Sequence, residues 1–70
     1  MAKANWADVE ALVSDWFGQG LQPDRGDLVD LAYQKDANDD VIDALDTLGA
    51  RPVESLASLK EQLEKNGVLA

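Results

Sequence analysis

The sequence predicts an all-α fold, a single compact bundle of four short helices. Apolar residues recur at helical spacing in four segments, residues that favour helix N-caps precede these segments, and no stretch alternates apolar with polar residues as a half-buried strand does. The 70 residues are enough for one domain, residues 1–70, and leave no room for a second. Connections of about three to seven residues are typical of helices packed in a bundle.

The first helix is expected to run from about Trp6 to Phe17. Asn5 is a favourable N-cap, and Asp8 three residues later completes a capping-box-like pair. Gly18 is expected to take the left-handed conformation that ends many helices. The apolar side chains fall within an arc of roughly 140° around the helix axis. They form the expected core face: Trp6, Val9, Leu12, Val13, Trp16 and Phe17.

The second helix follows Asp24, its expected N-cap, with Asp27 at the third helical position, and should end near Lys35. The third follows the N-cap Asn38, and Gly49 is its expected stop signal. The predicted core residues recur at i, i+3 and i+4 in the second helix and at i, i+4 and i+7 in the third. These faces are Leu28, Leu31 and Ala32 in the second helix, and Val41, Leu45 and Leu48 in the third.

An extended segment is expected at residues 51–53, because Pro52 disfavours helix at the residue before it. Ser55 then caps a fourth helix that should end at Asn66 and Gly67. Its narrow apolar stripe consists of Leu56, Leu59 and Leu63, and Val68 and Leu69 are expected to fold back onto the helix end.

Three stretches between Leu21 and Leu63 carry a wider pattern: Pro23 with Asp27, Leu28 and Ala32; residues 37–45; and residues 53–55. In this pattern the chain resembles a bacterial domain-of-unknown-function family of short helical proteins, over about two thirds of its length. Gln22 replaces the family's usual aromatic residue before Pro23, and Gly49 stands where Pro is common, so the two turns are expected to differ. The resemblance implies a small helical domain and no catalytic residues.

Catalytic, cofactor-binding and metal-binding residues are not predicted. The sequence has no His and no Cys, so its serines lack the commonest base and no thiolate site can form. Residues 36–40 resemble the start of an EF-hand loop, but Val41 replaces the required Gly and Thr47 the required Glu. Ser55 resembles the modified Ser of acyl carrier proteins, but only fifteen residues follow it where that family has roughly half the domain, so an N-cap role is the better explanation.

The composition also bears on location and partners. No apolar run could span a membrane, and the N-terminus lacks the apolar stretch of a signal peptide, so the protein is expected to be cytoplasmic. The net charge of −8 opposes direct binding to nucleic acid or anionic lipid and favours a basic protein partner.

The negative charge is concentrated in the middle of the chain. Residues 24–46 hold eight aspartates against Arg25 and Lys35, a net charge of −6. Asp39, Asp43 and Asp46 form a stripe at i, i+4 and i+7, and a solvated, solubilising face is its simplest explanation. A docking surface for a basic partner is the sharper hypothesis. Its candidate residues are Asp30, Asp36, Asp39, Asp43 and Asp46.

Trp6 and Trp16 are candidates for a second kind of contact. Both belong to the predicted core face, but two Trp side chains are difficult to bury completely in so small a core. One of them is therefore a candidate for a partner surface or a homodimer interface.

These observations favour a small acidic, non-enzymatic protein-interaction module. One alternative is an acidic mimic of nucleic acid that blocks a basic nucleic-acid-binding protein. Another is a carrier-type or accessory subunit that acts only in a complex.

Overall fold

The computed structural model describes residues 3–70, and Met1 and Ala2 of the predicted domain lie outside the described residues. The four helices are α1 (Trp6–Gly18), α2 (Arg25–Gln34), α3 (Asp39–Asp46) and α4 (Leu56–Lys65). Within residues 3–70, β-type pairing is limited to one isolated parallel bridge between Ala4 and Leu69. The predicted all-α bundle of four short helices is therefore confirmed.

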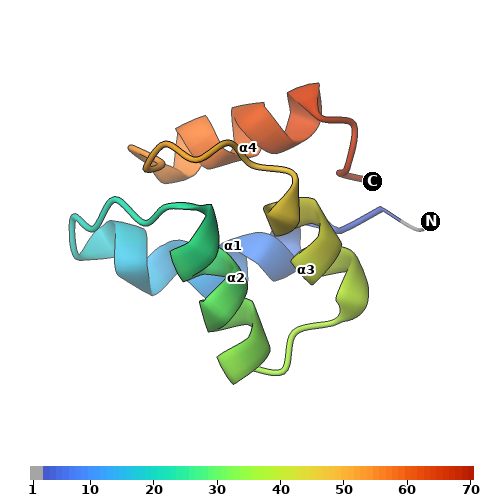
Figure 1. The fold of residues 1–70 in the computed structure, drawn as a ribbon, viewed down its shortest axis with the longest axis horizontal. Coiled ribbons are helices and arrows are strands. Elements are labelled where there is room, and N and C mark those ends of the chain that lie inside the picture. Colours follow the sequence, from blue (N-terminus) through green and yellow to red (C-terminus); the bar gives the residue numbers. More distant parts are fainter. Residues whose placement is uncertain (1–2) are drawn as a thin grey trace.

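The bundle consists of two helix pairs. In Figure 1, α4 lies along α1 and runs in the opposite direction, whereas α2 and α3 cross this pair steeply. The helices α2 and α3 pack on each other, and α2 also packs on α1. The N–H of Val53 donates a hydrogen bond of 2.8 Å to the carbonyl of Pro23. This bond joins the α3–α4 connection to the α1–α2 loop and ties the two pairs together.

One apolar core serves both pairs. It contains no buried polar or charged side chain among the described residues, and every helix contributes to it. The buried residues are Ala4, Val9, Val13, Leu28, Leu31, Ala32, Val41, Ala44, Leu45, Leu48, Val53, Leu59 and Leu63. Of the six residues predicted for the first core face, only Val9 and Val13 are fully buried, because the larger rings of α1 reach the rim of this small core.

Side-chain caps begin three of the helices as predicted. Asp24 and Asp27 form a reciprocal capping box, Asn38 accepts from the N–H of Val41 at 3.0 Å, and Ser55 accepts from the N–H of Ser58 at 3.1 Å. Each of these bonds satisfies a backbone donor that the helix itself leaves free.

The start of α1 differs from the prediction. Asn5 is the N-cap residue, but its side chain makes no capping hydrogen bond, so the predicted pair of Asn5 with Asp8 is wrong. Backbone bonds hold the entry to α1 instead. The N–H of Ala4 donates to the carbonyl of Val68 at 2.9 Å, and the N–H of Ala70 donates to the carbonyl of Ala4 at 2.8 Å.

Three helices end in the same Schellman geometry, with a left-handed residue just after the helix. That residue is Gly20 after α1 (φ +80°), Asp36 after α2 (φ +57°) and Gly67 after α4 (φ +71°). In each case the next N–H reaches back five residues, as from Leu21 to the carbonyl of Trp16 at 3.1 Å. Gly18 was predicted to be left-handed, which is wrong, because it is the last helical residue of α1.

The end of α3 is different. The hydroxyl of Thr47 donates to the carbonyl of Ala44 at 2.7 Å, and the amide of Asn66 donates to the hydroxyl of Thr47 at 3.0 Å. The helix thus stops before Gly49, which has no positive φ, and the prediction that Gly49 ends it is wrong. Leu48 still reaches the core from just beyond the helix.

Candidate functional site

The acidic stripe predicted on the third helix lies on an exposed face of α3. Asp39, Asp43 and Asp46 are all exposed, whereas Val41 and Leu45 on the other side of the helix are buried. One face of α3 therefore supplies the core, and the other presents a row of carboxylates to water.

These carboxylates form no salt bridge with a basic side chain of residues 3–70. Among residues 3–70, a salt bridge forms only between Lys65 Nζ and Glu61 Oε1, 3.3 Å apart on α4. Asp39, Asp43 and Asp46 are exposed to solvent, and Lys3 lines a hollow with Asp43 without forming a salt bridge to it.

The other two candidate aspartates have different surroundings. Asp30 is an exposed residue of α2. Asp36 has a structural role that the sequence did not indicate, because it is the left-handed residue that ends α2. Asp tolerates this conformation better than most residues because its short side chain can hydrogen-bond locally. The backbone position therefore accounts for part of the need for Asp36, although its carboxylate is exposed.

The two tryptophans lie at the rim of the core, each half-buried. The amino group of Lys60 lies 5.8 Å from the centre of the Trp6 ring, at cation–π distance, so α4 partly covers this ring. Trp16 lines a shallow hollow together with Leu21 and Pro23. Both rings pack against the core, and Trp16 lies beside the exposed Leu21.

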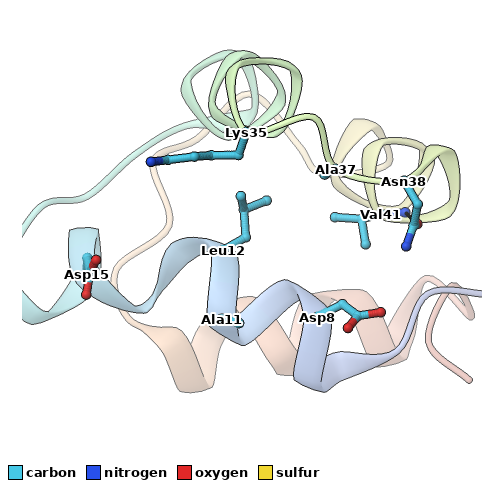
Figure 2. A pocket seen from close by; sticks show the side chains of 8 residues that line it. All are labelled: Asp8, Ala11, Leu12, Asp15, Lys35, Ala37, Asn38 and Val41. Atoms are coloured by element: carbon cyan, nitrogen blue, oxygen red, sulfur yellow. Dashed lines mark hydrogen bonds between the residues drawn. The ribbon is translucent and has the colours of Figure 1, made fainter.

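A groove lies between α1 and the turn that joins α2 to α3 (Figure 2). Its volume is about 460 Å³, within the usual range of ligand pockets. Asp8 and Asp15 lie along its α1 side, and Lys35 extends across it from the opposite side. Its remaining lining is mainly apolar and consists of Ala11, Leu12, Ala37, Val41 and the polar Asn38.

The groove and the acidic face are suited to binding. Within residues 3–70, no group of three or more His, Cys, Asp or Glu is placed to hold a metal ion. Asn38 and Ser55, which belong to the EF-hand-like and carrier-like motifs, are both engaged as N-caps. Over the same part of the chain, none of the helices has the length and apolar character needed to cross a membrane.

Comparisons with protein-family models, with curated proteins and with solved structures found no match.

Sequence reasoning located the acidic face but missed the groove. Two small residues could have indicated the groove, Ala11 on the flank of α1 and Ala37 in the α2–α3 turn. Larger side chains at these positions would fill the space between the elements. The sequence does not reveal that the α2–α3 turn lies over α1. It therefore gave no reason to place Ala11 and Ala37 in the same groove.

Proposed function

We propose that this protein is a small non-enzymatic interaction module that binds a basic partner protein through its acidic face. This face consists of Asp39, Asp43 and Asp46 on α3, and the exposed Asp30 and Asp36 are further candidates for the same contact. The observation that carries the proposal is that these exposed carboxylates have no basic side chain at salt-bridge distance within residues 3–70.

The fold accounts for only part of this charge, because Asp39 lies in the first turn of α3 and Asp36 ends α2, whereas Asp43 and Asp46 have no such role. Like charges at i, i+4 destabilise a helix by roughly 0.2–0.5 kcal/mol per pair, and Asp39 and Asp43 have this spacing on α3. An opposing basic surface removes this repulsion and gains charge complementarity, which accelerates association and selects the partner. We also propose a cytoplasmic location, and membership of the bacterial helical family that the sequence resembles, which adds no activity of its own.

The size of α3 favours a protein partner over mimicry of nucleic acid. Its eight residues span about 12 Å at 1.5 Å per residue. Duplex DNA carries one charge per roughly 1.7 Å of axis, so a decoy needs a longer and denser row of carboxylates to compete with it. A basic protein surface requires only a few matching charges.

The test is affinity capture from a lysate of the native host, with a triple variant that combines Asp39→Asn, Asp43→Asn and Asp46→Asn. We expect the wild-type protein to retain a basic protein at low salt and to lose it at high salt, because exposed charge pairs are screened. The triple variant should lose that partner while its circular dichroism shows unchanged helix content.

The control combines Glu54→Gln, Glu61→Gln and Glu64→Gln, which remove the same amount of charge from the C-terminal part of the chain. This variant should keep the partner. If both triple variants lose the partner equally, net charge alone explains the binding and the α3 face has no specific role. If the α3 variant keeps the partner, the proposal is wrong.

A further inference from the structure

We infer that the groove between α1 and the α2–α3 turn receives an apolar side chain of the partner protein, flanked by two basic residues that pair with Asp8 and Asp15. The inference rests on the proposed function for the basic character of the partner. Its location is distinct but adjacent, because the carboxylates that flank the groove belong to α1 and the main carboxylates of the acidic face to α3.

The spacing of the Asp8 and Asp15 carboxylates determines which partner segment fits the groove. Asp8 and Asp15 are seven residues apart on α1, which is about two turns or roughly 10.5 Å. Leu12 lies between them and points into the groove (Figure 2). A partner helix with Lys or Arg seven positions apart, and an apolar residue midway on the same face, places all three side chains against their counterparts.

The apolar part of the groove is left open by this chain. Leu12 is only half-buried and Ala11 is exposed, although both lie beside the buried Val41. Apolar surface in a concave site flanked by charge is typical of a contact in which one anchor residue is buried and the rim carries the charges. The matching charges here are negative, so the occupant is a basic segment.

Lys35 occupies the position that the partner's cation should take. In Figure 2 its side chain begins above Leu12 and extends toward the Asp15 end of the groove, and its amino group makes no salt bridge with Asp15. The side chain is exposed, so little holds it in place. It lies at the edge of the groove in the free protein and must move aside when the partner binds. Removal of this cation should therefore strengthen binding, whereas removal of either carboxylate should weaken it.

The test uses a synthetic peptide probe and heteronuclear NMR. The matched peptide is a helix of about 15 residues, near the length at which isolated helices become stable. It has lysines seven positions apart and a leucine midway on the same face. A second peptide of identical composition carries one lysine on the opposite face. We expect the matched peptide to shift the amide resonances of Ala11, Leu12 and residues 35–38, and to bind about threefold or more tightly than the second.

Substitutions then identify the groove. Ala11→Gln fills it at an exposed helical position and should weaken the matched peptide about fivefold or more, because the anchor side chain is excluded. Ala57→Gln makes the same change at an exposed position of α4 and should have no effect. Asp15→Asn should weaken binding about two- to fivefold, and Lys35→Gln should strengthen it to a similar extent.

The outcomes separate this inference from the proposed function. If the peptide shifts only resonances of α3, or if Ala11→Gln binds it as the wild-type protein does, the groove is not the site and the inference is wrong, while the acidic face remains a candidate. If the groove variants behave as expected but the α3 triple variant keeps the cellular partner, the groove stands and the acidic face does not. If neither peptide binds, the inference is also wrong.

Discussion

The middle of the chain and its C-terminal part contribute to the same core but differ in charge, since the first is strongly negative and the second is balanced. Residues 24–46 hold eight aspartates and two basic residues, and the aspartates on α3 form no salt bridge with any of residues 3–70. Residues 47–70 balance three acidic against three basic residues, with Glu61 paired to Lys65 and Lys60 over the ring of Trp6. Both parts nevertheless supply fully buried leucines to the core, Leu28 and Leu45 in the first and Leu59 and Leu63 in the second. The acidity of α3 is thus independent of the packing beneath it.

The largest expected effect tests whether the two parts share one core. Leu45→Ala on α3 and Leu59→Ala on α4 should each lower the free energy of unfolding by about 2–5 kcal/mol, since both side chains are fully buried. Urea unfolding followed by Trp fluorescence measures this. If only one substitution lowers the free energy of unfolding by less than about 1 kcal/mol, its helix packs loosely on the core. The two parts would then differ in packing as well as in surface charge.

An intermediate effect concerns the helix ends. Asp36→Gly should stabilise the protein by about 1 kcal/mol, because Gly adopts the left-handed conformation at φ +57° without steric cost. Gly67→Ala should destabilise it by a similar amount at φ +71°. Thermal unfolding followed by circular dichroism measures the stability of both variants against the wild-type protein.

Gly18→Ala is the control for these ends. Gly18 is helical, and no atom lies within 4 Å of the added methyl group, so the change should stabilise α1 by up to about 1 kcal/mol. A destabilised Gly18→Ala variant, or an unchanged Asp36→Gly variant, would contradict the assignment of the left-handed residues.

The smallest effects test the charge difference itself. Asp43→Asn should raise the free energy of unfolding by a few tenths of a kcal/mol, because it removes repulsion with Asp39 and Asp46. Glu61→Gln should lower it by a few tenths, because the pair with Lys65 is lost. Both differences should disappear in about 1 M salt. If both substitutions change the free energy of unfolding in urea at low salt in the same direction, α3 and α4 do not differ in charge as described.

Local sequence rules accounted for most of the fold. The positions of the four helices and three of their N-caps follow from apolar spacing and from Asp24, Asn38 and Ser55, all of which act within a few residues. The errors arose where distant segments meet. Asn5 makes no side-chain cap where Ala4 pairs with the C-terminal segment, and α3 ends where Asn66 reaches Thr47.

The candidate site was predictable only in part. The charge of residues 24–46 and its exposed stripe can be read from the sequence, because both depend on one helix. The role of Asp36 could not, since a left-handed residue at this position is usually Gly and the sequence gives no Gly there. The groove depends on the packing of α1 against the α2–α3 turn, which no local pattern specifies.

The pairing of Ala4 with residues 68–70 has an architectural consequence. The polypeptide enters and leaves the fold side by side, as the two ends in Figure 1 show. A short flexible linker can join these ends, and the exposed residues 49–52 between α3 and α4 can supply new termini. Circular permutation at this loop is therefore expected to preserve the core. By the same geometry, the whole fold can be inserted into a surface loop of a larger protein without forcing the host's strands or helices apart.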